Sequence, residues 1–290
     1  KKMITKGAVE EILNICTKVS HNNEIFDITS EIKKNIKKIS VGLNKDGLRV
    51  IAICEKNVTN QDTFSIADES NMVLTGFIGF LDPPKESAEI AIKRMNEAGI
   101  RVIVLTGDNA EVTSCICKKV GIKTAKIILG SEIDKLPDSG VIRLIKRKHN
   151  VFAKLSPIQK ARIIRLLKAS GNVVGYMGDG INDTPSLTNS DVGVSVDTAV
   201  DIAKETADII LLEKDLNVLL DGVTEGRKTF SNLLKYIKLA VSFNFGEVTS
   251  VLIASILLPF FPITPIQLLV QSLLYDIGQL TLPFDNVDVD

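Results

Sequence analysis

The sequence predicts an α/β fold with a doubly wound parallel sheet, and three features support that prediction. Over residues 73–214, apolar strand-like runs alternate with amphipathic helical segments, an order typical of a parallel sheet. Two of the expected helices are followed by a glycine, Gly99 and Gly121, which commonly ends a helix. An apolar run at 172–177 leads into a glycine-rich loop at 178–183, as expected for a buried strand with a ligand-binding loop at its carboxyl end.

The composition excludes several classes of protein. The 290 residues suffice for about two domains, and the 35 basic and 35 acidic residues balance, so no nucleic-acid-binding surface is expected. The 4 cysteines are too few for a disulfide scaffold. Cys115 and Cys117 could bind a metal, but on a helix they would point to different faces, which favours reduced structural cysteines. No initiator methionine or signal peptide is visible, so we expect a piece of a longer protein.

Residues 1–72 are expected to form a separate, more polar region. The expected elements are a strand at 3–5, a turn at 6–8, helices at 9–19 and 29–44, a strand at 48–53 and a loop at 57–70. Lys6 lies beside Gly7 in the expected strand-to-helix turn, where a lysine can reach a nucleotide phosphate. An exposed lysine without a ligand is the more common outcome for such a turn, and that alternative stays open.

Strands and helices alternate through the rest of the α/β region. We expect strands at 73–81, 101–105, 126–129, 150–153, 172–177, 192–194 and 208–212, and helices at 86–98, 111–120, 139–148 and 156–168. The start of the last helix is well marked. Ser156 precedes Pro157, and Gln159 takes the third helical position, which together make a capping box.

The last fifth of the chain is far more apolar than the rest. An amphipathic helix is expected at 216–236, followed by apolar segments at 239–261 and 266–284, each about 20 residues and long enough to span a bilayer. A buried helical hairpin in a soluble protein is the alternative. Carboxylates within membrane segments are costly unless they meet an ion or a partner, so Glu247 and Asp276 are functional candidates.

Three loops carry polar side chains that suit phosphate chemistry. Asp179 and Asp183 flank Asn182 in the glycine-rich loop and supply hard oxygen ligands for Mg²⁺, although an ordinary surface turn is the alternative. Thr106 follows another expected strand, and Lys160 lies in the first turn of the capped helix. Because the carboxyl ends of parallel strands meet at one edge of a sheet, we expect these groups to converge.

Such a set of groups suits transfer of a phosphoryl group onto a carboxylate. Thr106 would hold a phosphate oxygen, Lys160 would neutralise charge, and the aspartate pair would hold Mg²⁺. The motifs Thr106-Gly107-Asp108, Lys160 and Gly178-Asp179-Gly180-Ile181-Asn182-Asp183 together resemble the phosphorylation domain of P-type cation ATPases, of the haloacid-dehalogenase class. The resemblance covers essentially the whole chain. It is strongest to magnesium-transporting members in three segments, 152–160, 211–216 and 275–279.

The resemblance implies an order of domains and a set of roles. It implies part of an α+β nucleotide-binding domain at 1–72, a haloacid-dehalogenase-like phosphorylation domain at 73–214, a stalk helix at 215–238 and a transmembrane helix pair at 239–290. It implies that Thr106, Gly107, Asp108, Lys160 and Asn182 are catalytic, that Asp179 and Asp183 bind Mg²⁺, and that Lys6, Gly7, Arg49 and Asp82 serve ATP binding. The transported ion would meet Asn244, Glu247, Ser272 and Asp276.

By the same resemblance, the whole protein is an ATPase that transports Mg²⁺ through an aspartyl-phosphate intermediate. It would be a multi-pass protein of the plasma membrane with its α/β part in the cytoplasm. Its partners would be ATP, the divalent cation, lipid and the remaining domains of the same polypeptide, with no nucleic acid. The phosphorylated aspartate belongs to a DKTGT motif that this chain lacks. We expect it before Lys1, and we expect the chain alone to be inactive.

Three alternatives stay open. The first is a pump for Ca²⁺ or another divalent cation. Glu247 and Ser272 lie where magnesium pumps are expected to carry asparagine, and a glutamate at position 247 resembles the calcium pumps. A soluble phosphatase of the same fold is another, disfavoured by the apolar segments of 239–284. A non-enzymatic membrane scaffold that lost its nucleophile is the third.

Overall fold

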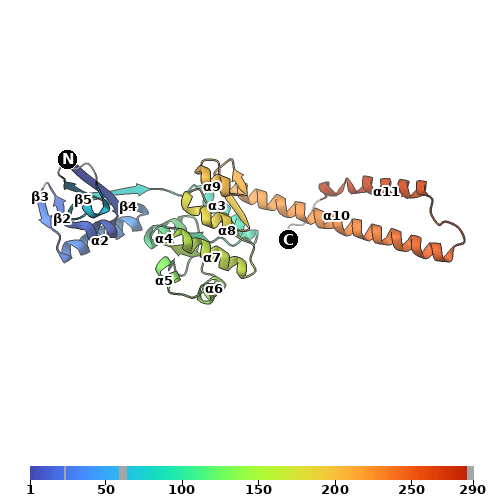
Figure 1. The fold of residues 1–290 in the computed structure, drawn as a ribbon, viewed down its shortest axis with the longest axis horizontal. Coiled ribbons are helices and arrows are strands. Elements are labelled where there is room, and N and C mark those ends of the chain that lie inside the picture. Colours follow the sequence, from blue (N-terminus) through green and yellow to red (C-terminus); the bar gives the residue numbers. More distant parts are fainter. Residues whose placement is uncertain (23, 59–63, 286–290) are drawn as a thin grey trace. The chain divides into compact units, whose positions relative to one another are not determined.

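The structure is a computed structural model that describes residues 1–22, 24–58 and 64–285 (Figure 1). The chain divides into two units, Lys1–Leu216 and Asn217–Asp290. In the described residues, the first unit contains one five-stranded sheet and two three-stranded sheets. The second unit is helical.

The five-stranded sheet has the order β1-β4-β5-β2-β3. Its strands are β1 (Lys2–Ala8), β2 (Cys16–His21), β3 (Glu24–Asp27), β4 (Leu48–Asn57) and β5 (Met72–Leu81). Neighbouring strands are antiparallel except β2 and β5, which are parallel. Helices α1 (Val9–Ile15) and α2 (Ser30–Lys45) and the short 3₁₀ helix η1 (Ile66–Asp68) complete this part. Its core includes the fully buried Ala52, Cys54 and Met72.

Several expectations for this part are wrong, because strand pairing between distant segments overrides the local pattern. Lys6-Gly7-Ala8 is not a turn but continues β1, paired with residues 51–53 of β4. The helix expected at 9–19 ends at Ile15, and the following residues form β2 beside β5. The strand expected at 73–81 forms as β5, but it pairs with β4 and β2 instead of opening a parallel sheet. Of the loop expected at 57–70, residues 59–63 lie outside the described residues.

The remaining strands of the first unit are parallel, as predicted, and all except β10 are shorter than predicted. One sheet has the order β6-β8-β7, with β6 (Val104–Leu105), β7 (Ile128–Leu129) and β8 (Val151–Ala153). The other has the order β11-β10-β9, with β9 (Gly175–Met177), β10 (Val192–Val196) and β11 (Ile209–Leu211). Within the described ranges these are two separate three-stranded sheets, so the single doubly wound sheet is not confirmed.

Helices alternate with these strands. They are α3 (Ser87–Glu97), α4 (Ala110–Lys119), α5 (Gly130–Asp134), α6 (Asp138–Lys146), α7 (Pro157–Ala169), the 3₁₀ helix η2 (Ile181–Asp183), α8 (Thr184–Asn189) and α9 (Asp201–Thr206). The sequence predicted α3, α4, α6 and α7 but missed the short α5, α8 and α9. Phe152 of β8 and Ile163 of α7 are fully buried in one shared core cluster, which fixes the helix against the sheet.

The local signals for helix ends are confirmed. The Ser156 hydroxyl accepts from the Gln159 N–H at 3.3 Å, and Gln159 Oε1 accepts from the Ser156 N–H at 2.8 Å, which completes the capping box of α7. Gly99 and Gly121 both adopt φ of +73°, the left-handed conformation that glycine takes after a helix.

The second unit is a helical hairpin. The segments expected at 216–236 and 239–261 form one helix, α10 (Leu216–Leu257), whose 42 residues span about 63 Å. It contains an apolar window with a mean hydropathy of 1.5 that is not buried, so α10 is long and apolar enough to cross a membrane. Helix α11 (Pro265–Gln279) has 15 residues and spans about 22 Å, less than the hydrocarbon core of a bilayer. The second span expected at 266–284 is therefore not confirmed.

Candidate active site

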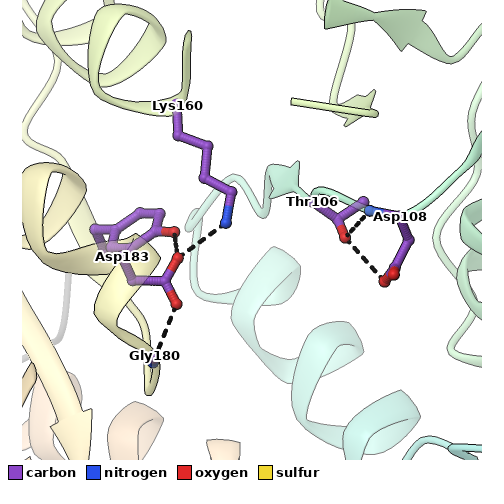
Figure 2. A network of polar contacts seen from close by, with 6 residues as sticks. Thr106, Asp108, Lys160, Gly180 and Asp183 are labelled. Carbon is purple, nitrogen blue, oxygen red and sulfur yellow. Dashed lines mark hydrogen bonds and ion pairs between the residues drawn. The ribbon is translucent and has the colours of Figure 1, made fainter. Parts of the chain in front are cut away.

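A shielded ion pair lies directly after β9. Asp183 Oδ1 accepts hydrogen bonds from Lys160 Nζ at 2.9 Å and from the Tyr176 hydroxyl at 2.7 Å. Asp183 Oδ2 accepts from the Gly180 N–H at 3.3 Å (Figure 2). The side chains of Lys160 and Asp183 are only 12% and 16% exposed, so this pair is largely screened from water. Both carboxylate oxygens of Asp183 are thus occupied by groups of the chain itself.

The glycine-rich loop allows this approach. A Cβ at position 178 would lie 2.5 Å from the Cβ of Asp183, so only glycine lets Asp183 turn back toward β9. The loop backbone is tied to β10, because the Gly178 carbonyl accepts from the buried Ser195 hydroxyl at 2.9 Å and the Gly178 N–H donates to Val194 O at 3.1 Å. The loop therefore holds Asp183 in one place relative to the sheet.

The surroundings fix the charge states of Asp183 and Tyr176. Burial alone would raise the pKa of Asp183, but hydrogen bonds from Tyr176, Lys160 and the Gly180 N–H outweigh it and hold the pKa below its usual value. Burial, together with the hydrogen bond to Asp183, raises the pKa of Tyr176 well above its usual value. Near neutral pH, Asp183 is therefore an anion and Tyr176 a neutral donor.

Thr106 and Asp108 form a second network at the end of β6. The Thr106 hydroxyl donates to Asp108 Oδ2 and accepts from the Asp108 N–H, both at 3.1 Å. Backbone hydrogen bonds join this loop to the segment after β8, from the Leu155 N–H to Thr106 O at 3.0 Å and from the Lys154 N–H to Asp108 O at 2.7 Å. Figure 2 draws the two networks with no hydrogen bond between them. The Thr106 hydroxyl, in the loop after β6, and the Lys160 ammonium group, in the first turn of α7, are thus separate donors of the same α/β unit.

Asp179 does not join Asp183 around a shared site. Its Oδ2 lies 2.7 Å from Lys214 Nζ. Over the described residues, no group of three or more His, Cys, Asp or Glu side chains could hold a metal ion. In this structure Lys160, Tyr176 and Gly180 occupy the Asp183 carboxylate while Lys214 pairs with Asp179, so the joint binding of Mg²⁺ by Asp179 and Asp183 stays a prediction. Asn182 lies exposed in η2.

The candidate nucleotide residues lie on or beside the five-stranded sheet. Lys6 and Gly7 are in β1, whose partner β4 carries Arg49, so these residues share two neighbouring strands. The Arg49 side chain is 70% exposed, and its Nε lies 3.4 Å from Asp108 Oδ1. Asp82 is exposed and follows β5 directly, where the predicted break occurs. At Gly107 a Cβ would meet only ordinary contact distances, so the fold itself does not require glycine there.

The four candidate ion-transport residues lie on the two helices of the second unit. The rings of Phe243 on α10 and Tyr275 on α11 stack with centroids 3.9 Å apart. Glu247 is four residues after Phe243 and Ser272 three residues before Tyr275, so each shares the face of its helix that carries the stacked ring. Both side chains are half-buried, whereas Asn244 and Asp276 are exposed.

Comparisons with known proteins show which proteins this chain is similar to. A family model described as P-type ATPase, cytoplasmic domain N, matches residues 1–87. Over 288 residues the chain is 50% identical to the magnesium-transporting ATPase, P-type 1, of Escherichia coli (strain K12), an alignment that covers 99% of this chain. The same identity is found with the protein of that name from Salmonella typhimurium (strain 14028s / SGSC 2262). Over almost its whole length, the chain is similar to part of the P-type ATPases.

The match is to part of these relatives, since the chain spans 32% of their length. A calcium-transporting ATPase 1 of Bacillus cereus is 34% identical over 290 residues, which is more distant than the magnesium-transporting relatives. The family match over 1–87 includes β5, in agreement with its pairing in the first sheet. The similarity to these transporting ATPases, together with the exposed apolar window of α10, supports a membrane protein.

Sequence reasoning missed two residues of the site. Tyr176 lies in an apolar run, where a tyrosine looks like a core residue, and nothing in the pattern reveals its hydrogen bond to Asp183. Lys214 lies 35 residues from Asp179. Its segment, 211–216, supported the family resemblance but did not indicate a partner for Asp179. Both roles follow from tertiary contacts.

Proposed function

We propose that this chain is the part of a P-type ATPase that supports phosphoryl transfer and carries its effect toward the membrane. In the whole protein, ATP hydrolysis through an aspartyl-phosphate would drive transport of Mg²⁺. The observation that carries the proposal is the shielded Lys160–Asp183 pair after β9, since a fixed ammonium group at a strand end is suited to neutralising a phosphoryl group. The identity to magnesium-transporting relatives supports the choice of ion.

The residues take the following roles in this proposal. The Thr106 hydroxyl binds a phosphate oxygen, and the Lys160 ammonium group stabilises the charge of the transferring group. Asp183 positions Lys160 by accepting its hydrogen bond, and Tyr176 holds Asp183 in place by donating to the same oxygen. Gly107, Asp108 and Asn182 complete the phosphate loops, as the family resemblance implies.

Asp179 is the side chain that fits catalytic Mg²⁺. It is a half-exposed carboxylate at a strand end, and proteins commonly bind Mg²⁺ with one or two carboxylates, several waters and substrate phosphates. When bound, the metal would neutralise phosphate charge. The remaining ligands would be water, phosphate and groups outside this chain. Asp183 is a positioning residue in this proposal and not a ligand.

The five-stranded sheet would bind ATP. Lys6 and Gly7 of β1 and Arg49 of β4 would lie beside the nucleotide, and Asp82 would lie directly after β5. The cationic side chains of Lys6 and Arg49, on neighbouring strands, are suited to binding the phosphates of ATP. The division of the chain into a nucleotide-binding domain, a phosphorylation domain and a membrane hairpin is likewise proposed. Because β5 pairs in the first sheet, the first boundary is placed after β5.

The hairpin would carry the ion. Glu247, Ser272, Asn244 and Asp276 would line its path through a multi-pass protein of the plasma membrane, with the α/β unit in the cytoplasm. The stacked rings of Phe243 and Tyr275 hold the two helices together at this level and support such a shared path. The exposed apolar surface of α10 disfavours a soluble phosphatase.

The experiment is the ATPase activity of the full-length parent protein in lipid, titrated with Mg²⁺, Ca²⁺ and Mn²⁺ beside an Asp276→Asn variant. Stimulation by Mg²⁺ beyond the need for MgATP, lost in the variant, is expected. Stimulation by low Ca²⁺ would favour a calcium pump, for which Glu247 is the supporting residue. Absence of cation-dependent activity would contradict the pump assignment.

A further inference from the structure

The glycine-rich loop carries a second charged pair, which the proposed chemistry leaves without a role. Lys214 Nζ lies 2.7 Å from Asp179 Oδ2, and the two side chains are 55% and 54% exposed. In the part of the chain that the structure describes, this is the ion pair that Asp179 makes. The carboxylate that best fits Mg²⁺ is therefore already paired with a cation of the protein, in a place that water and ions can reach.

The backbone around both residues is held independently of this pair. The Asp179 carbonyl accepts from the Val200 N–H at 3.2 Å. On the other side, the Lys214 carbonyl accepts from Lys85 Nζ at 2.6 Å. With β10 between β9 and β11, the loop after β9 and the segment after β11 are two strand spacings apart, about 10 Å, which an extended lysine can bridge to a carboxylate.

We propose that Lys214 is a displaceable counter-ion of Asp179, which a divalent cation must replace when it binds. This inference rests on the proposed function. An ammonium group and Mg²⁺ compete for the same oxygen, and an exposed lysine–carboxylate pair is weak enough to be displaced. Lys214 thereby lowers the affinity of Asp179 for metal and keeps the loop charge balanced when no metal is bound.

The position of Lys214 gives the exchange a further consequence. Lys214 is two residues before the first residue of α10, Leu216. When metal binds Asp179, the Lys214 side chain loses its partner, and the segment between β11 and α10 loses this side-chain contact with the loop. Metal binding at the strand end is thus coupled to the segment from which α10 begins.

The test measures metal binding directly, with Mn²⁺ as a paramagnetic probe titrated into the full-length parent protein in detergent and free Mn²⁺ followed by electron paramagnetic resonance. Lys214→Met is expected to bind Mn²⁺ roughly two- to fivefold more tightly, the range that an exposed ion pair supports. Lys214→Arg keeps the pair and is expected to bind like the unchanged chain. Lys204→Met removes a positive charge whose ion-pair partner is Asp201 and is the matched control for net charge.

The outcomes separate the two levels of the proposal. Asp179→Asn is expected to weaken Mn²⁺ binding at least several-fold. Affinity in Lys214→Met that is equal to or below that of the unchanged chain, while Asp179→Asn still weakens binding, would overturn the counter-ion role and leave the proposed function intact. Unchanged binding in Asp179→Asn, or no binding of Mn²⁺ by the unchanged full-length protein, would overturn both. Thermal melts of each variant verify folding.

Discussion

Tyr176 and Lys160 donate hydrogen bonds to the same oxygen of Asp183, at 2.7 Å and 2.9 Å. The tyrosine comes from β9 and the lysine from the first turn of α7. Asp183 therefore joins a strand, a loop and a helix through one carboxylate. This arrangement leaves the lysine ammonium in a fixed position, and the first three predictions follow from it.

Tyr176→Phe removes one donor to Asp183 without changing the ring. A hydrogen bond to a charged group contributes about 1.5–3 kcal/mol, so we expect the free energy of unfolding to fall by about 2 kcal/mol. Lys160 and the Gly180 N–H still bind Asp183, so the loop is expected to keep its conformation. Urea denaturation measures the change. A variant as stable as the unchanged chain would show that the tyrosine hydroxyl does not stabilise the anion.

Asp183→Asn leaves Lys160 in a shielded place without its anion. Removing one partner of a buried pair is strongly destabilising, and we expect a loss of about 3 kcal/mol at neutral pH. The pKa of Asp183 is lowered in the folded chain, so its contribution is complete above the usual aspartate pKa of about 3.9 and is lost as pH falls through the folded value.

The difference in melting temperature between the unchanged chain and Asp183→Asn is therefore expected to shrink below about pH 4. Melting curves recorded from pH 7 to pH 3 test this. A difference that stays constant over that range would contradict the charge assigned to Asp183.

Gly178→Ala places a methyl group 2.5 Å from the Cβ of Asp183. The loop or Asp183 must shift, and we expect a loss of about 1–3 kcal/mol of stability together with weakened pairing to Lys160. Gly180→Ala is the matched control, since its nearest neighbour is the Asp183 carboxylate at 3.6 Å and its φ of −109° suits alanine. Equal stability of the two variants would mean that close approach at residue 178 is not needed.

Local signals in the sequence predicted much of the α/β part. The capping box at Ser156 and the glycines at 99 and 121 depend on residues within one turn of the backbone, so the pattern alone locates these helix ends. The glycine-rich loop after an apolar run was likewise predicted in its place. Each of these features is determined by residues that are adjacent in the sequence.

Features that depend on distant partners were not predictable in the same way. Residues 16–19 look helical but pair as a strand with β5, more than 50 residues later. The partners of Asp179 and Asp183 are Lys214, 35 residues away, and Lys160, 23 residues away. An acidic residue in a loop supplies a carboxylate, but the sequence does not show whether a lysine or a metal ion pairs with it. For this reason the sequence does not reveal that these two carboxylates form separate ion pairs.

The most direct measurement of the central claim is phosphoenzyme formation by the full-length parent protein from radiolabelled ATP, compared with Lys160→Met. The account predicts an acid-stable label on the unchanged protein that hydroxylamine removes, as for an acyl phosphate. It also predicts strongly reduced labelling in Lys160→Met, with melting curves showing that the variant is folded. No label on the unchanged protein, or full labelling at an unchanged rate in Lys160→Met, would contradict the role assigned to this site.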